Sequence, residues 1–331
     1  MIFEDKPVKN NSADWWAERT KQLLESEKKY WPLLQINYKN LNNVSTRAFP
    51  FDNFEIRVQF NPARIKSSAA DISNEAIQSR KCFLCLENLP HEQDGLSYNK
   101  HFVILSNPHP IFPEHFTISK RNHSPQTIIG NFEELLDITR DLGKYYTVFY
   151  NGPKCGSSAP DHMHFQAVSK NVMPIETDFE KMVSKLEKAV LRNGKIEIRL
   201  FEDHLRYFIS AESRNKGELL YAFKTFVNAF KKISPPHEEP LMNILASYQE
   251  DIWRLIFFPR QKHRPTQFYA ESEKSLLISP AAVDMGGLFI VPREEDFEKI
   301  TRENITDIFR QVTISKEYFE FLRKKIGEIF I

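Results

Sequence analysis

The stretch Tyr150–Lys170, which reads YNGPKCGSSAPDHMHFQAVSK, carries the pattern from which the rest of this chain can be interpreted. His162, His164 and Gln166 alternate in it, so on a β-strand all three side chains leave the same face. The segment 152–158 before them is small and polar, which suits a loop whose backbone N–H groups approach a phosphate. Two incidental histidines on a half-exposed strand are the alternative. A loop of this kind that leads directly into His-x-His-x-Gln favours a catalytic site instead.

His-x-His-x-Gln behind such a loop resembles the histidine triad superfamily, and more narrowly its nucleotidyltransferase branch. That branch holds galactose-1-phosphate uridylyltransferase, diadenosine tetraphosphate phosphorylase and the GDP-hexose phosphorylases. The run Asp161–Gln166 is most similar to the GDP-hexose phosphorylases, because the uridylyltransferases usually carry proline between the two histidines. The resemblance implies that His164 is the nucleophile that takes a nucleoside monophosphate and that Gln166 hydrogen-bonds the phosphate oxygens. The loop residues that we expect to contact the substrate are Asn151, Gly152, Ser157 and Ser158.

The resemblance also implies an α+β fold of two fused HIT-like half-domains, with antiparallel sheets flanked by helices. The second half of the chain repeats the order strand, strand, helix, strand, strand of the first. Setting Asp251 against Asp161 places Ile252, Arg254 and Ile256 at the positions of the two histidines and the glutamine. We therefore expect the second copy to have lost the chemistry.

Four segments are predicted along the chain. They are an N-terminal helix and lead-in over 1–50, a catalytic half over 51–175, a degenerate half over 176–293 and C-terminal helices over 294–331. Ser12 is expected to cap the N-terminal helix and Pro32 to stop it. The two C-terminal helices are predicted as Glu294–Gln311 and Lys316–Phe330. The segment Ser279–Arg293 before them resembles the C-terminal segment of the GDP-hexose phosphorylases, and a glycine turn between strands is the alternative.

Composition excludes several classes of protein. A length of 331 residues can bury one large core or two fused ones, and a net charge of +1 gives no basic excess for binding nucleic acid. No apolar run reaches the length of a bilayer, so we expect no membrane contact. Three cysteines do not suggest a disulfide framework, which favours a cytoplasmic protein. A monomer and a homodimer both remain open.

A metal site is predicted from the pair Cys82-x-x-Cys85. The resemblance implies that His123 and His162 are the other two ligands, which together would complete a tetrahedral structural zinc site. A pair of free thiols is the main alternative, and a thioredoxin-like redox pair is a weaker one. His162 is counted with the catalytic pair as well, but a histidine that ligates zinc cannot also act as an acid or base.

Further substrate-binding residues are expected on either side of this pair. Arg64 and Lys66 follow an alternating strand and resemble the basic segment that grips substrate phosphates in the uridylyltransferases, although a solvated loop is as good an interpretation for Lys66. Asn107 matches the asparagine that contacts the ribose region, and His115 matches the histidine that opens the next strand. Lys120 is included as a substrate contact.

The resemblance therefore implies a nucleotidyltransferase that acts through a covalent nucleotidyl-histidine, with phosphorolysis of a nucleoside diphosphate sugar as the expected reaction. The acceptor would be inorganic phosphate or a sugar 1-phosphate. A diadenosine polyphosphate phosphorylase or a hexose-1-phosphate uridylyltransferase is the alternative within the same chemistry. A hydrolase that uses water, or a nucleotide-binding protein without turnover, is the alternative from another class.

Overall fold

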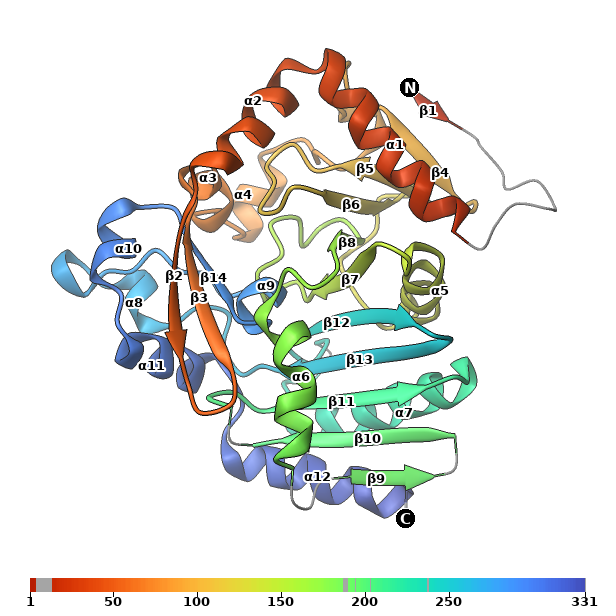
Figure 1. Cartoon of the computed structure of the whole chain (residues 1–331), viewed down its shortest axis with the longest axis vertical. Coiled ribbons are helices and arrows are strands. Elements are labelled where there is room, and N and C mark those ends of the chain that lie inside the picture. The colour runs from red at the N-terminus through yellow and green to blue at the C-terminus, as the bar shows by residue number, and fades with distance from the viewer. Residues whose placement is uncertain (4–13, 187–189, 194, 203, 237, 331) are drawn as a thin grey trace.

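The computed structural model of the chain describes residues 1–3, 14–186, 190–193, 195–202, 204–236 and 238–330, so the predicted cap Ser12 lies outside it. Within these residues, eleven strands form one sheet in the order β1-β4-β5-β6-β8-β7-β12-β13-β11-β10-β9 (Figure 1). Its strands are β1 (Ile2–Phe3), β4 (Gly95–Tyr98), β5 (Phe102–Ser106), β6 (His115–Lys120), β7 (Tyr146–Asn151), β8 (His164–Ser169), β9 (Val190–Asn193), β10 (Ile196–Phe201), β11 (Phe208–Ser213), β12 (Met242–Gln249) and β13 (Ile252–Pro259).

Apart from the edge strand β1, which pairs with β4, the sheet consists of two five-stranded halves that meet at β7 and β12. Strands β4-β5-β6-β8-β7 of the first half have the same order as β9-β10-β11-β13-β12 of the second. Asn151 of β7 lies opposite Asn243 of β12 at this junction, and the pairing is antiparallel. The α+β fold of two fused halves is confirmed, with the difference that the halves share one continuous sheet.

The second half has an ion pair where the first half has its histidine. Arg254 of β13 lies opposite Glu212 of β11, as His164 of β8 lies opposite Ser119 of β6. The Arg254 guanidinium binds the carboxylates of Glu212 and Glu180, the latter at 2.7 Å. With its cation already neutralised by two carboxylates, this position offers no nucleophile.

Among the described residues, five helices contribute to one hydrophobic core on one face of the sheet. They carry apolar residues at helical spacing on the side that faces the strands. Pro32 does not simply stop the N-terminal helix, because it occupies the first turn of a second one, where its missing N–H costs nothing. The helices of this layer are α1 (Trp15–Tyr30), α5 (Phe132–Leu142), α7 (Lys216–Lys231) and α12 (Lys316–Phe330), with α2 (Pro32–Asn40) following α1.

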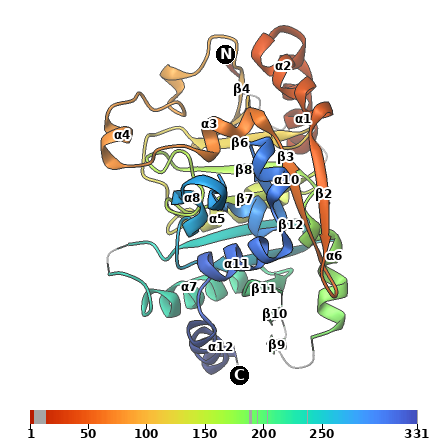
Figure 2. The same cartoon turned by 90° about the vertical axis from the view of Figure 1, so that its left-hand side faces the viewer.

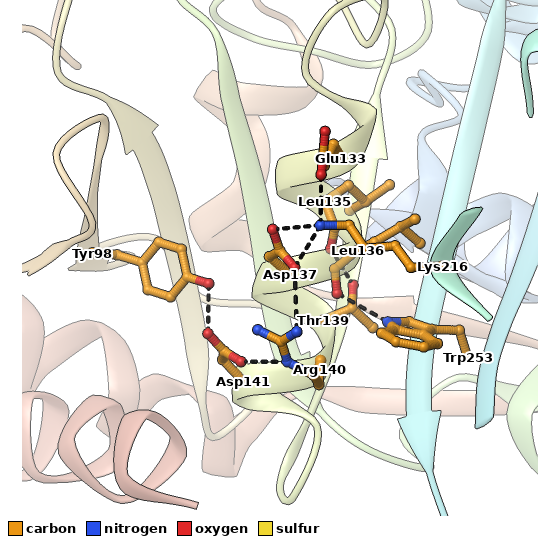
Figure 3. Close-up of polar contacts among 10 residues, drawn as sticks. All are labelled: Tyr98, Glu133, Leu135, Leu136, Asp137, Thr139, Arg140, Asp141, Lys216 and Trp253. Atoms are coloured by element: carbon orange, nitrogen blue, oxygen red, sulfur yellow. Dashed lines mark hydrogen bonds and ion pairs between the residues drawn. The ribbon is translucent and has the colours of Figure 1, made fainter. Parts of the chain in front are cut away.

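Helix α5 ties the two halves together (Figure 3). Lys216, at the start of α7, places its Nζ 2.8 Å from the carboxylate of Asp137, and the indole N–H of Trp253 in β13 donates to the carbonyl of Leu136 at 3.0 Å. On the other side of the helix, the hydroxyl of Tyr98 in β4 donates to Asp141 at 2.7 Å. Helix α5 of the first half therefore contacts strand β4 of its own half and both strand β13 and helix α7 of the second half.

A second core lies on the opposite face, between the large sheet and a set of smaller elements that Figure 2 views from their side. A three-stranded sheet in the order β14-β3-β2 is the main element, with β14 parallel to β3. The elements of this layer are β2 (Ser45–Pro50), β3 (Glu55–Phe60), α3 (Ile65–Ser68), α4 (Asn74–Gln78), α6 (Pro174–Ser184), α8 (Thr266–Tyr269), α9 (Ala282–Met285), β14 (Leu288–Val291), α10 (Glu294–Lys299) and α11 (Arg302–Val312).

Three sequence expectations differ from this structure. The predicted helix Glu294–Gln311 is interrupted before Thr301, whose hydroxyl accepts from the N–H of Asn304 and caps α11. Helix α6 starts at Pro174 and so crosses the boundary predicted between 175 and 176. Strand β8 begins at His164, after the first histidine of the motif. Among the described residues, no helix is long and apolar enough to cross a membrane.

Candidate active site

A cavity of about 570 Å³ lies over the middle of the first half of the sheet. Its floor comes from alternate residues of neighbouring strands, which leave the same face of the sheet. Gln166 of β8 lies opposite Thr117 of β6 and Phe149 of β7, and all three line the cavity beside His164. The alternation of His164 and Gln166 thus places both side chains in the cavity, as the sequence predicts.

The imidazole of His164 is held in one tautomer. Its Nδ1 lies 2.8 Å from the carbonyl oxygen of His162, which can only accept, so Nδ1 carries the proton and the lone pair is on Nε2. The residue is 4% exposed, and this burial lowers the pKa of His164 to about 4. At neutral pH the ring is therefore uncharged and has a fixed orientation.

The backbone of His164 is clamped by Gln126, a residue that sequence reasoning missed. The Gln126 amide donates to the carbonyl of Asn151 at 2.8 Å and to the carbonyl of His164 at 3.0 Å. It also accepts from the N–H of His164 at 2.8 Å. One buried side chain thus joins the two ends of the loop that separates β7 from β8. A lone glutamine after Pro125 carries no signal by which the sequence could have indicated this.

Gln166 is oriented by His115. The N–H of Ile111 donates to Nδ1 of His115 at 3.2 Å, so Nε2 of His115 carries the proton and donates to Oε1 of Gln166 at 2.8 Å. Burial lowers the pKa of His115 to about 3, which keeps the ring neutral and this tautomer in place. The Gln166 NH₂ group is therefore the part of the amide that remains to donate to a ligand. The sequence marks His115 as a family match but does not reveal this role.

Arg64 and Asn107, both predicted to contact the substrate, line the same cavity. The Arg64 guanidinium donates to the carbonyl of His109 at 2.6 Å, and among the described residues it forms no ion pair. Burial lowers the pKa of Arg64 to about 10, so the group stays charged at neutral pH. The side-chain amide of Asn107 bonds to neighbouring residues: it donates to Thr117 at 3.3 Å and accepts from the N–H of His109 at 2.9 Å.

The loop residues divide between the cavity and its support. Asn151 and Ser158 line the cavity, whereas Gly152 lies against the backbone of the second half and Ser157 is buried away from the cavity. Gly156, which the sequence did not single out, lines the cavity at a φ of +89°, and a Cβ there would stand 2.4 Å from the Cβ of Ala281. Only glycine suits that backbone and that contact.

The second half supplies one wall of the cavity through the segment that holds α9. The N–H of Ala282 donates to Oδ1 of Asn151 at 2.7 Å, and Asn243 donates to the same oxygen at 2.9 Å. Arg260, which is fully buried, donates to Oδ1 of Asn243 at 2.6 Å and to the carbonyl of Pro280 at 3.0 Å. Residues of the second half therefore hold the loop that follows β7 of the first half in position.

Two buried cations and one buried acid surround α9. Arg206 donates to the carbonyl of Met285 at 2.6 Å, and burial lowers its pKa to about 9. Arg206 and Arg260 form no ion pair among the described residues. Asp284 lines the cavity, accepts from the N–H groups of Ala281 and Ile290, and has its pKa raised to about 6 by burial. Neither of these arginines lines the cavity, where the charged side chains among the described residues are Arg64, Arg80, Asp71 and Asp284.

Cys82, Cys85, His123 and His162 form one cluster, whose ligand atoms all lie within 4.8 Å of one another. Nδ1 of His162 lies 3.2 Å from the Cys82 sulfur, and Nδ1 of His123 lies 3.3 Å from the Cys85 sulfur. Burial and the neighbouring Cys82 raise the pKa of the Cys85 thiol to about 12, so a thiolate pair here needs a cation between the sulfurs. The donor set fits a tetrahedral zinc ion.

His162 belongs to this cluster and not to the cavity floor, which corrects the prediction that all three motif side chains converge. Because β8 begins at His164, the ring of His162 turns to the cysteines, and its Nε2 donates to the carbonyl of Lys120 at 2.7 Å. The ammonium of Lys120 donates to Asn131 at 2.9 Å, and the residue does not line the cavity. The side chain of Lys66 lies outside the described part of the chain.

Two family models match the chain. Residues 23–169 match the "Domain of unknown function (DUF4922)" and residues 182–330 match "GDPGP1-like, C-terminal domain". No curated protein matches. Among solved structures, yeast Ap4A phosphorylase Apa2 in complex with Ap4A is 15% identical over 95% of this chain and 99% of its own, with a TM-score of 0.60. The same enzyme with AMP is 16% identical over 89% of this chain and 96% of its own, with a TM-score of 0.55.

The family models and the solved structures can be compared with the family suggested by the His-x-His-x-Gln motif. The GDPGP1-like model and the fold shared with Apa2 support the resemblance to the nucleotidyltransferase branch of the histidine triad superfamily. Apa2 shares the fold across nearly the whole of both chains, and the GDPGP1-like model covers the half that closes the cavity.

Proposed function

We propose that this chain is a nucleotidyltransferase that works through a nucleotidyl-histidine and catalyses the phosphorolysis of a nucleoside diphosphate sugar. The observation that carries the proposal is the state of His164. It lines the cavity as a neutral imidazole with Nδ1 tied to the carbonyl of His162 and the lone pair on Nε2. A nucleophile of fixed tautomer is what an in-line attack on an α-phosphate needs.

In the first step, Nε2 of His164 attacks the α-phosphorus, an N–P bond forms and the bond to the bridging oxygen breaks. The distal sugar phosphate leaves with the electron pair of that bond. The positive charge that develops on the ring is stabilised by the Nδ1–H donation to the His162 carbonyl, and the proton stays on Nδ1 throughout. In the second step, inorganic phosphate attacks the phosphorus from the vacated side, and the N–P bond breaks.

Charge in the transition state is stabilised by groups already aimed into the cavity. The NH₂ group of Gln166, fixed by His115, donates to the equatorial phosphate oxygens. The guanidinium of Arg64 neutralises the distal phosphate. It is available to do so because it forms no ion pair among the described residues. The buried Arg260 adds a positive potential behind the loop at Asn151.

Zinc held by Cys82, Cys85, His123 and His162 belongs to the same proposal. When bound, the ion cross-links the segment around the cysteines to the start of β8 and acts as a structural centre. The chain supports it with an outer contact, since His162 turns Nδ1 to the sulfurs while Nε2 donates to the Lys120 carbonyl. The ion pair of Arg80 with Asp161, at 2.6 Å, joins the same two segments.

Two substrate classes fit this chemistry. Ap4A phosphorolysis is favoured by one observation, the similarity in fold to Apa2, whose solved complexes hold Ap4A and AMP. A nucleotide sugar is favoured by the GDPGP1-like C-terminal half and by the wording of the Asp161–Gln166 motif. Since a fold shared at 15% identity says little of substrate, we prefer the second.

A substrate screen with and without phosphate tests the proposal. Nucleoside diphosphate sugars and dinucleoside polyphosphates of several bases are incubated with the protein, and nucleotide products are followed by chromatography. We expect a nucleoside diphosphate and a sugar 1-phosphate to be released from a nucleotide sugar when phosphate is present, and neither in the His164→Ala variant. Turnover that needs no phosphate would identify a hydrolase, and no turnover of any compound would favour a binding protein.

A further inference from the structure

The cavity extends across several strands, with the nucleophile near its middle. Leu105 of β5 lines one end, His164 of β8 lies between, and Asn151 of β7 lines the other end. The strand order β5-β6-β8-β7-β12 therefore places Leu105 and Asn151 on opposite sides of His164. With neighbouring strands about 4.8 Å apart, the ends are separated by a distance that a nucleotide with a further group can span.

The two ends differ in chemistry. The end at β5 is apolar and is lined by Leu84, Leu89, Pro90 and Leu105, which suits the flat face of a base. The end at β7 is continued by the segment before α9, because the N–H of Ala282 donates to Asn151.

The lining of this second end combines the side chains of Ala281, Val283 and Asp284 with a group of small polar side chains. The small polar ones are Ser67, Ser68 and Asp71 from the segment that begins with α3, and Ser279 from the segment before α9; we call these four residues the serine wall. Arg264 joins its two segments, since its guanidinium donates to the carbonyl of Ala70 at 2.7 Å and to the hydroxyl of Ser279 at 3.0 Å.

We propose that the serine wall is the subsite for the hexose of a nucleoside diphosphate sugar and that it disfavours the second nucleoside of a dinucleoside polyphosphate. This inference rests on the proposed function and specifies its substrate. Three hydroxyls and a carboxylate donate to and accept from the hydroxyls of a sugar. A second base would instead need an apolar or aromatic face, and the four described residues of the wall offer none.

Arg264 explains how this wall keeps its shape. The ring of Phe268 lies under the Arg264 guanidinium at 4.0 Å, which holds the cation flat between the two segments. The charge lies at the end of the cavity away from the base, on the side where the distal phosphate and sugar would bind. Burial lowers the pKa of Arg264 but leaves the group charged at neutral pH.

The test measures binding, so that turnover is not required. Calorimetry is performed in a His164→Ala background with nucleoside diphosphates, nucleoside diphosphate glucoses and diadenosine tetraphosphate, with guanosine, adenosine and uridine as bases. We expect a Ser67→Ala, Ser279→Ala pair to weaken the best nucleotide glucose about tenfold, the loss of one or two hydrogen bonds, and to change the matching nucleoside diphosphate by less than about twofold. Leu89→Ala, at the apolar end, should weaken both ligands equally.

Three results would overturn the inference. The serine pair could weaken the nucleotide sugar and the nucleoside diphosphate by the same factor, or by none. Diadenosine tetraphosphate could bind the His164→Ala protein more tightly than any nucleotide glucose and lose affinity in the serine pair, which would make the wall a nucleoside subsite. Failure of every nucleotide to bind would reject the proposed function itself and this inference with it. Melting curves confirm that the serine variants are folded.

Discussion

Replacing Gln126 with alanine tests whether one buried amide holds the nucleophile in place. The amide makes three hydrogen bonds, two to the carbonyls of Asn151 and His164 and one from the N–H of His164. At about 1 kcal/mol for each bond, their loss costs roughly 3 kcal/mol of unfolding free energy, and the unpaired backbone groups raise this toward about 5 kcal/mol. A displacement of the His164 ring by about 1 Å would lower turnover roughly 100-fold.

Urea unfolding and turnover of the Gln126→Ala protein give the two numbers. Gln126→Glu keeps an acceptor for the His164 N–H but turns a buried carboxylate to the carbonyls of Asn151 and His164, so its loss of stability should be at least as large as that of Gln126→Ala. Thr139→Val is the matched control, because it removes one buried hydrogen bond, at 2.6 Å to the Leu135 carbonyl, from a helix on the opposite face of the sheet. A Gln126→Ala protein that loses less than about 1 kcal/mol and keeps turnover within twofold would refute this reasoning.

Three further predictions concern the surroundings of the site. Burial raises the pKa of Glu27 to about 7, so the folded protein holds a proton that the unfolded chain releases near pH 4.5, and the free energy of unfolding falls as the pH rises between these two values. In urea unfolding at pH 8, the Glu27→Gln variant should therefore be about 3 kcal/mol more stable than the unaltered protein. The same pH dependence in both proteins would count against a buried proton on Glu27. Cys82→Ser should lower the melting temperature and the zinc content measured by elemental analysis, and less than about half an equivalent of zinc in the unaltered protein would reject the metal site. The His115→Phe variant removes the hydrogen bond that orients the Gln166 amide, and it should lower turnover roughly tenfold with KM unchanged. The loss expected for Gln166→Ala is larger, roughly 100- to 1,000-fold. Full activity of His115→Phe would show that the Gln166 amide does not need this hydrogen bond.

Local patterns predicted the parts of this structure that depend on local geometry. The short apolar run Phe102–Ser106 and the segment Ile196–Phe201 each favour a strand and are strands with these bounds, and the spacing of apolar residues favours the helices α5 and α7. The capping pair Thr301 and Asn304 was also a readable signal, and it divides the predicted C-terminal helix.

The rest depends on contacts between distant segments. Arg264 reaches the Ala70 carbonyl across 194 positions, and Asn243 reaches the loop at Asn151 across 92. For His162, the period-two spacing predicts a position on the cavity face, whereas the family resemblance places it with the distant cysteines, where its Nδ1 lies 3.2 Å from the Cys82 sulfur. Such pairings have no local signature, so the sequence places His164 and Gln166 on one strand but does not indicate the side chains that hold them.

Covalent labelling of the protein tests the nucleotidyl-histidine most directly. The protein is mixed with nucleotide sugars labelled in the α-phosphate, without phosphate or any other acceptor, and is then precipitated and digested. We expect the unaltered protein to acquire an acid-labile label on the peptide that holds His164, and the His164→Ala variant to acquire none. When phosphate is added, the label should be released as nucleotide. Label that persists in His164→Ala, or an unaltered protein that turns over substrate without ever acquiring label, would contradict the nucleotidyl-histidine mechanism.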